Sequence, residues 1–109
     1  MNLKTTFTPA EFEVLARTDL SQTTCVVFDI LRATSSMITA LANGAEQILP
    51  VASIDEALAA KAKYPDALLC GERDGLRITA AQTGGTEFDL GNSPREYTAE
   101  TVAGKTLIS

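Results

Sequence analysis

The chain has 109 residues, with nine Lys or Arg and fourteen Asp or Glu, which gives a formal net charge of −5. This length fits one domain over residues 1–109, and a composition that is 45% hydrophobic and 21% charged excludes a disordered tail, a collagen and a coiled coil. The chain contains no histidine, which excludes imidazole-based zinc sites and a histidine general base within it.

The acidic charge also bears on partners. A phosphate backbone repels an acidic chain that has no run of Lys or Arg, so we expect no nucleic-acid partner. The longest apolar stretch, from Cys25 to Leu31, is too short to cross a bilayer, and the chain does not open on a signal peptide. We therefore expect a cytoplasmic protein without a membrane partner, in which Cys25 and Cys70 are reduced and structural.

Three helix starts share one pattern, a hydroxyl N-cap followed three residues later by a glutamate that can accept a hydrogen bond from the N–H of the cap. The caps are Thr8, Ser53 and Ser93, and a proline follows the cap in two of them, at a helical position that needs no N–H. A fourth helix is predicted over about Thr34–Asn43, because apolar residues recur there at helical spacing and Gly44 supplies the left-handed stop.

Continuous apolar runs lie between these helices, at Thr24–Phe28, Gln47–Val51 and Ala67–Cys70. Runs of this kind are typical of strands that are covered on both faces. Strands that alternate with helices at this spacing favour βαβ units. The sequence therefore predicts an α/β fold, a three-layer α/β/α open sheet that is mostly parallel.

The pattern is less regular toward the C-terminus. The glycine-rich stretch Gly71–Gly91 predicts a loop region with short strands near residues 76–78 and 88–90. The last residues, Lys105–Ser109, have the composition of a buried strand. We therefore expect the single α/β domain to be the N-terminal part of a longer protein.

Acids and arginines follow three of the predicted strands or precede the helices after them. In an open parallel sheet the ligand lies beyond the carboxyl ends of the strands, where helix N-termini offer N–H groups to anions. Carboxylates suit a hard divalent cation, and guanidinium groups bind phosphate. The mixture predicts a metal-assisted phosphate site. The candidates are Asp29, Arg32, Thr34, Ser35 and Ser36 at the first junction, Glu72 and Arg73 at the second, and Asp89, Asn92, Ser93 and Arg95 at the third.

Each group also has a purely structural interpretation. Asp29 has the position of a residue that caps the following helix, and Glu72 with Arg73 fits an ordinary surface pair. The N-cap role already accounts for Ser93, and the apolar surroundings of Cys70 favour the core.

Two covalent phosphatase motifs fail by one residue. A Cys-x5-Arg loop from Cys70 needs an arginine where Leu76 stands, and an Asp-x-Asp motif from Asp29 needs an acid where Leu31 stands. The sequence therefore does not support a cysteinyl-phosphate or aspartyl-phosphate enzyme through these motifs.

Four strings occur in order along the chain: Val27–Thr34, Ala40–Ala45, Gly71–Arg73 and Phe88–Pro94. Together they resemble the first half of the 2-phosphosulfolactate phosphatases, over most of the chain from about Thr24. The resemblance implies a magnesium-dependent acid phosphatase of the coenzyme M and sulfolactate pathways. Such an enzyme hydrolyses 2-phospho-3-sulfolactate, a small phosphorylated sulfonate and carboxylate, to 3-sulfolactate and phosphate.

The resemblance places seven of the candidates at the motif positions of the family: Asp29, Arg32, Glu72, Arg73, Asp89, Asn92 and Ser93. We infer their individual roles from their chemistry. The carboxylates would bind Mg²⁺, directly or through water, and the ion would polarise the phosphoryl oxygens and activate a water. Arginines and the N–H groups that open the Thr34 helix would neutralise the phosphoryl group, and Arg95 with the N-terminus of the Ser93 helix would receive the sulfonate or carboxylate. The expected metal ligands are Asp29, Glu72 and Asp89, the catalytic residues Asp29, Arg32 and Arg73, and the substrate-binding residues Arg32, Thr34, Asn92, Ser93 and Arg95.

The chain also departs from the family pattern. The stretch Thr79–Glu87 is longer than expected, Cys70 stands where a small residue is expected, and the chain ends before a Thr- and Asn-Gly-rich motif.

Two alternative functions stay open. One is a non-catalytic α/β domain that binds an anion or phosphate. The other is an assembly role, in which an open sheet edge pairs with a second copy to form a homodimer.

Overall fold

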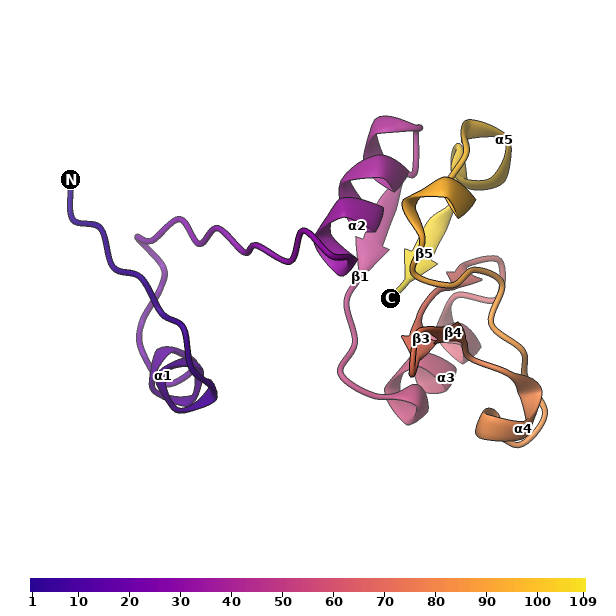
Figure 1. Cartoon of the computed structure of the whole chain (residues 1–109), viewed down its shortest axis with the longest axis horizontal. Helices are drawn as coiled ribbons and strands as arrows, with labels where there is room; N and C mark the ends of the chain where they lie inside the picture. Colours follow the sequence, from indigo (N-terminus) through magenta and orange to yellow (C-terminus); the bar gives the residue numbers. More distant parts are fainter.

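The chain folds into short strands and helices in the computed structural model, which describes residues 1–109 (Figure 1). The helices are α1 (Pro9–Leu15), α2 (Ala33–Ala42), α3 (Ile54–Lys63), α4 (Ala80–Thr83), the 3-10 helix η1 (Pro94–Glu96) and α5 (Ala99–Val102). The strands are β1 (Gln47–Leu49), β2 (Leu68–Leu69), β3 (Glu72–Arg73), β4 (Leu76–Arg77) and β5 (Thr106–Ile108). No helix is both long and apolar enough to span a membrane.

The main sheet is parallel, as the sequence predicts. Its strand order is β1-β5-β2, so the last strand in the sequence is the central one. Leu107 is in register with Ile48 of β1 on one side and with Leu68 of β2 on the other. A separate antiparallel hairpin joins β3 to β4, directly after β2. The α/β class and the mostly parallel sheet are therefore confirmed.

Consecutive residues of β5 point into two different apolar clusters, because side chains alternate across a strand. Leu107 packs in the cluster that contains Ala40 of α2 and Val102 of α5. Ile108 packs in the cluster that contains Ala57 of α3. The centre of the sheet is thus covered on both faces, which explains why residues 67–70 and the adjacent Leu107 and Ile108 are apolar.

The predicted strand at Thr24–Phe28 is wrong. This segment is extended but joins neither sheet, and Figure 1 shows it running between α1 and the main body. Val27 and Phe28 are 74% and 81% exposed. Apolar and β-branched residues favour an extended backbone, but they do not by themselves supply a neighbouring strand. Cys25 is consequently an exposed free thiol, so the prediction that it is a structural cysteine is wrong as well, whereas Cys70 is free and buried.

The capping pattern predicts the helices well, with one correction. Thr8 and Glu11 form a capping box at α1, and the Ser53 hydroxyl accepts a hydrogen bond from the Glu56 N–H at the start of α3. Ser93, however, begins a three-residue 3-10 helix and not an α-helix. The chain turns at Tyr97, whose side chain is buried, before α5 begins.

The irregular region contains one more helix than expected. Within the long stretch 79–87, the Gln82 side chain accepts a hydrogen bond from the Thr79 N–H at 2.9 Å, which helps to start α4. Gly84 ends that helix in the left-handed conformation, with φ of 78°, which glycine adopts without strain. The predicted strand near 76–78 is β4, whereas residues 88–90 contribute only a bridge between Leu90 and Cys70.

Candidate functional site

A pocket lies at the carboxyl ends of the three parallel strands. Its volume is about 100 Å³, and its lining includes Val51 after β1, Gly71 after β2 and Ser109 after β5. The first residues of α3, Ser53 and Ile54, form another part of the wall. This is the edge of an open parallel sheet at which ligands are expected to bind.

Glu72 and Arg73 line this pocket from the β3–β4 hairpin. The Glu72 carboxylate accepts a hydrogen bond from the Gly75 N–H at 2.6 Å, which closes the turn of the hairpin. Arg73 donates to the main-chain oxygen of Glu72 at 3.2 Å, and no salt bridge engages its guanidinium. The predicted pair is therefore at the pocket, with the arginine charge uncompensated by an ion pair.

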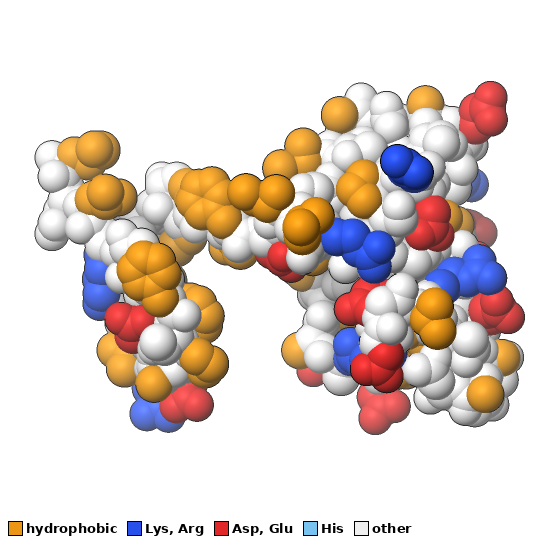
Figure 2. Space-filling view, in the orientation of Figure 1, with side chains coloured by type: hydrophobic (Ala, Val, Ile, Leu, Met, Phe, Trp, Pro, Cys, Tyr) orange, Lys and Arg blue, Asp and Glu red, His pale blue; other side chains and the backbone are white.

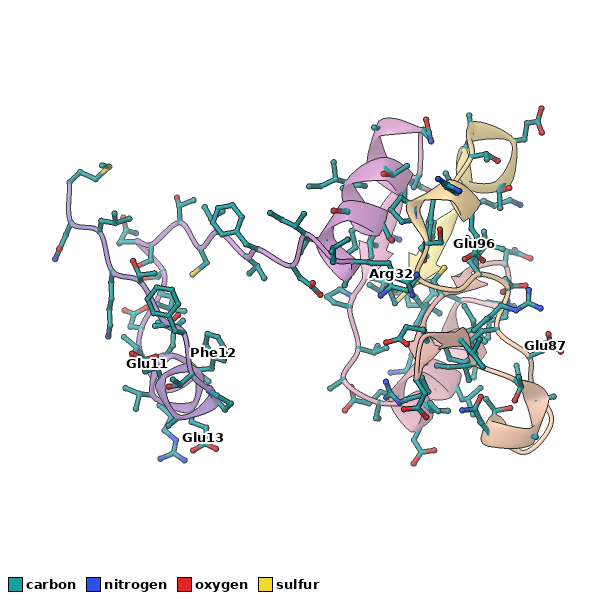
Figure 3. The ribbon with its side chains drawn as sticks, in the orientation of Figure 1. Glu11, Phe12, Glu13, Arg32, Glu87 and Glu96 are labelled. Carbon is teal, nitrogen blue, oxygen red and sulfur yellow. The ribbon has the colours of Figure 1, made fainter.

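A second group of candidates lies at the start of α2. The Thr34 hydroxyl donates to the Asp29 main-chain oxygen at 2.7 Å and accepts from the Asp29 N–H at 2.9 Å. One carboxylate oxygen of Asp29 accepts from the Ala33 N–H at 3.3 Å. Asp29 therefore caps α2, which is the structural interpretation open from the sequence. Arg32 extends from the start of α2 toward the main body (Figure 3).

The third group is joined to α2 by a long-range hydrogen bond. The Ser36 hydroxyl donates to the main-chain oxygen of Asn92 at 2.9 Å. This contact places Asn92 and Ser93 beside the first turns of α2, which also carry Thr34. Arg95 lies next in η1 and is exposed. Since η1 has only three residues, it does not supply the helix N-terminus that the sequence predicts after Ser93 for the sulfonate or carboxylate.

Asp89 has a structural partner in β2. Its carboxylate accepts a hydrogen bond from the Leu69 N–H at 2.8 Å, and its own N–H donates to the Leu69 oxygen at 2.8 Å. Arg77 donates to the Asp89 main-chain oxygen at 3.2 Å and forms a salt bridge of 2.7 Å with Glu87. Asp89 thus connects the segment that follows β4 to β2, which is an edge strand of the main sheet.

The three carboxylates expected to bind magnesium do not converge. No group of three acidic or cysteine side chains in the chain is arranged to hold a metal ion. Asp29, Glu72 and Asp89 each accept a hydrogen bond from a backbone N–H of their own neighbourhood. As placed here they do not fit a shared Mg²⁺ site, so we derive no catalytic step through the ion.

Two side chains that the sequence did not suggest as functional, those of Glu96 and Tyr97, hold the Asn92 loop. The Glu96 carboxylate accepts from the Gly91 N–H at 2.8 Å, and the Tyr97 hydroxyl donates to the Gly91 oxygen at 2.7 Å. The capping pattern identified Glu96 only as a partner of Ser93. Nothing local in the sequence indicates that Gly91 is the second partner or that Ser36 reaches this loop.

Burial makes the side chains of Cys70 and Tyr97 unsuitable as nucleophiles or bases. It raises the pKa of the Cys70 thiol to about 12, so the thiol stays protonated near neutral pH. Burial also raises the pKa of Tyr97, which keeps its hydroxyl as the hydrogen-bond donor to Gly91. The core interpretation of Cys70 is therefore confirmed.

The surface around these groups carries both signs of charge. Figure 2 shows Lys, Arg, Asp and Glu side chains over the face of the body between α2 and the hairpin, whereas α1 and the extended segment expose many hydrophobic side chains. Cationic guanidinium groups and polar side chains at the strand ends can bind an anion and stabilise negative charge on it. The fold and site define an α/β domain with a pocket at the carboxyl ends of its parallel strands, lined by an arginine that forms no ion pair.

Comparison with known proteins identifies the family. The model of the 2-phosphosulpholactate phosphatase family matches residues 10–109. The chain belongs to this family, which confirms the resemblance found in its motifs.

Curated relatives agree with this assignment. A protein from Thermotoga petrophila is 49% identical over 85 residues, which is 78% of this chain and 34% of the relative. One from Clostridium acetobutylicum is 50% identical over 86 residues, again 78% of this chain and 34% of the relative. One from Carboxydothermus hydrogenoformans is 52% identical over 83 residues, 76% of this chain and 31% of the relative. All three are named probable 2-phosphosulfolactate phosphatase, and the chain spans about a third of their length.

Proposed function

We propose that this chain supplies the phosphate-binding part of a phosphoric monoester hydrolase that acts on 2-phospho-3-sulfolactate and releases 3-sulfolactate. The family match and the names of the relatives support the phosphatase class. The observation that carries the proposal is the pocket at the carboxyl ends of the sheet, into whose wall the hairpin brings Arg73. A doubly or singly charged phosphate ester is the kind of ligand that such a cation selects.

The contribution of this chain to the reaction is electrostatic. Arg73 would bind the phosphoryl oxygens, and Arg32 would add positive charge from the start of α2. Charge shifts among the phosphoryl and bridging oxygens during transfer, so preoriented guanidinium groups stabilise the transition state more than the ground state. Asn92 and Ser93 would donate hydrogen bonds to the phosphate group, and Arg95 would bind the sulfonate or carboxylate of the substrate.

Magnesium dependence stays a prediction of the proposal. It depends on Asp29, Glu72 and Asp89 acting together, whereas these carboxylates here bind backbone N–H groups. That same observation favours a second function, a domain that binds phosphate without hydrolysis, in which the acids are structural. We also propose that the protein acts in the cytoplasm.

The decisive experiment measures phosphate release from 2-phospho-3-sulfolactate. It compares this chain with a chimaera in which the rest of the Thermotoga petrophila relative follows Ser109. We expect hydrolysis by the chimaera, and a loss of about 100-fold or more in kcat/KM on Arg73→Ala, the order found when one preoriented charge donor is removed from an active site.

Arg17→Ala is the matched control, because Arg17 is exposed and follows α1, away from the pocket. An inactive but folded chimaera that binds inorganic phosphate supports the binding function instead. Full activity of Arg73→Ala would contradict the proposed role of the pocket.

A further inference from the structure

The Glu96 carboxylate holds both ends of the loop that carries Asn92. Its Oε2 accepts a hydrogen bond from the Gly91 N–H at 2.8 Å, and its Oε1 accepts from the Ser93 N–H at 3.4 Å. Glu96 lies within the main body and not at its solvent-facing tips (Figure 3). Hydrogen bonds to a carboxylate are stronger than bonds between neutral groups, so this one side chain fixes the loop on both sides of Asn92.

Gly91 has no side chain, which allows the Glu96 carboxylate to lie close to the loop. A Cβ atom at Gly91 would lie 2.8 Å from Glu96 Oε1, closer than such atoms approach one another. Gly91 does not have a positive φ, so its backbone would accept another residue. A side chain at position 91 would therefore displace the Glu96 carboxylate from the place that it occupies beside Gly91.

Two further side chains hold the same loop. The Tyr97 hydroxyl donates to the Gly91 oxygen at 2.7 Å, and the Ser36 hydroxyl donates to the Asn92 oxygen at 2.9 Å. With the two bonds of Glu96, four main-chain atoms over residues 91–93 are engaged. None of these bonds uses the side-chain amide of Asn92, which can therefore form hydrogen bonds with a ligand. A loop fixed in this way loses little conformational entropy when the ligand binds.

We propose that Glu96 is a positioning residue, which acts through the main chain of Gly91 and Ser93 to orient Asn92 and Ser93 toward the phosphorylated substrate. This inference rests on the proposed function. The carboxylate itself does not touch the substrate. Its effect is therefore expected on the affinity for the anion and on KM, more than on the chemical step.

The first test is a titration of the ¹⁵N-labelled chain with inorganic phosphate, followed by NMR at the Asn92 side-chain amide and the Ser93 N–H. We expect phosphate to shift both signals. Glu96→Ala should weaken the binding about tenfold, because the loop loses both of its hydrogen bonds to this carboxylate and must be ordered by the ligand. The control is Glu100→Ala, an exposed glutamate in the first turn of α5, which should leave the affinity unchanged. Equal affinity in Glu96→Ala and the unmodified chain would overturn the proposal.

Two more variants separate positioning from loss of folding. Glu96→Gln keeps the side-chain volume and one acceptor oxygen, so it should fold and show an intermediate loss of affinity. Gly91→Ala places a methyl group against Glu96 and should weaken binding by the same route. In the double variant with Glu96→Ala, the Gly91→Ala change should add nothing, because the two act on one contact. Additive losses would contradict a shared mechanism.

The chimaera distinguishes this inference from the proposed function. In an active chimaera, Glu96→Ala should raise KM for 2-phospho-3-sulfolactate by more than it lowers kcat. An unchanged KM in an active enzyme overturns the positioning role and leaves the phosphatase function intact. An inactive chimaera, with phosphate affinity still dependent on Glu96, overturns the phosphatase function and supports the positioning role.

Discussion

The Ser36 hydroxyl donates a hydrogen bond to the main-chain oxygen of Asn92, 2.9 Å away and 56 positions along the chain. Ser36 is only 2% exposed, so this bond is shielded from water. It ties α2, which carries Thr34, to the loop that carries Asn92 and Ser93. Two groups of candidates that are far apart in the sequence are therefore held together by one buried hydroxyl.

Ser36→Ala should lower the free energy of unfolding by about 1 kcal/mol, because the main-chain oxygen of Asn92 loses its donor in a part-buried hydrogen bond. The effect should be measurable by urea denaturation. Ser35→Ala is the neighbouring control, because the Ser35 hydroxyl donates to the exposed Ile30 oxygen, where water can replace it. Equal destabilisation by both variants would contradict the importance of the Ser36 bond.

We predict that the Asp89 carboxylate stabilises the end of β2. Its carboxylate accepts the Leu69 N–H at 2.8 Å at the end of β2. Asp89→Ala should therefore destabilise the fold by about 1–3 kcal/mol, since that N–H loses its acceptor. Asp74→Ala changes an acid in the hairpin turn, but Asp74 has a φ of 54°, so Asp74→Gly is the better control and should be close to neutral. A neutral Asp89→Ala would show that Asp89 is free for a role at the site.

The local parts of the structure could be predicted from the sequence. The Thr8 and Ser53 caps and the Gly44 stop act over one helical turn, and the helices begin and end where these residues place them. Ala67, Leu69, Cys70, Leu107 and Ile108 are buried because the sheet is covered on both faces.

The remaining features depend on partners that are distant in the sequence. The residues Thr24–Phe28 have the composition of a buried strand, yet no composition identifies the strand with which they would pair. The Glu96 bond to Gly91 and the Ser36 bond to Asn92 are set by how η1 and α2 pack. The sequence therefore predicts that acids and arginines lie at the ends of strands. It does not predict their hydrogen-bond partners, which decide whether a side chain caps a helix or takes part in catalysis.

The two cysteines should differ in reactivity. Cys25 is exposed, whereas burial raises the pKa of Cys70 from 9.0 to about 12. At pH 8 a thiol reagent such as DTNB should modify Cys25 in the folded chain, and Cys70 only after unfolding in guanidinium chloride. Cys25→Ser is the control and should remove the fast reaction. Rapid modification of Cys70 in the folded chain would contradict its burial.

The same shift makes stability depend on pH in the alkaline range. The pKa of Cys70 is higher in the folded state than its ordinary value of 9.0, so the unfolded chain releases the proton first. The contribution to stability is complete below about pH 9 and is lost as the pH rises toward about 12. Thermal unfolding of the chain and of Cys70→Ala across this range should show a steeper fall for the unmodified chain. Parallel curves would show that the thiol does not contribute.

Asp29 is the residue for which capping and metal binding can be separated most directly. Asp29→Asn keeps an oxygen that can accept the Ala33 N–H, as the carboxylate does at 3.3 Å, and asparagine caps helices about as well as aspartate. We therefore expect the fold of the chain to be unchanged. Asp29→Ala removes the acceptor and should cost about 1 kcal/mol of stability.

The magnesium prediction is tested with the same pair of variants in the chimaera. If Asp29 binds Mg²⁺, Asp29→Asn should shift the magnesium titration of phosphate release to higher concentration, because the amide is a poorer ligand than the carboxylate. Asp66→Asn, an exposed acid after α3, is the control and should leave the titration unchanged. A titration unchanged by Asp29→Asn, together with destabilisation by Asp29→Ala, would assign Asp29 to the cap of α2 and remove it from the proposed metal ligands.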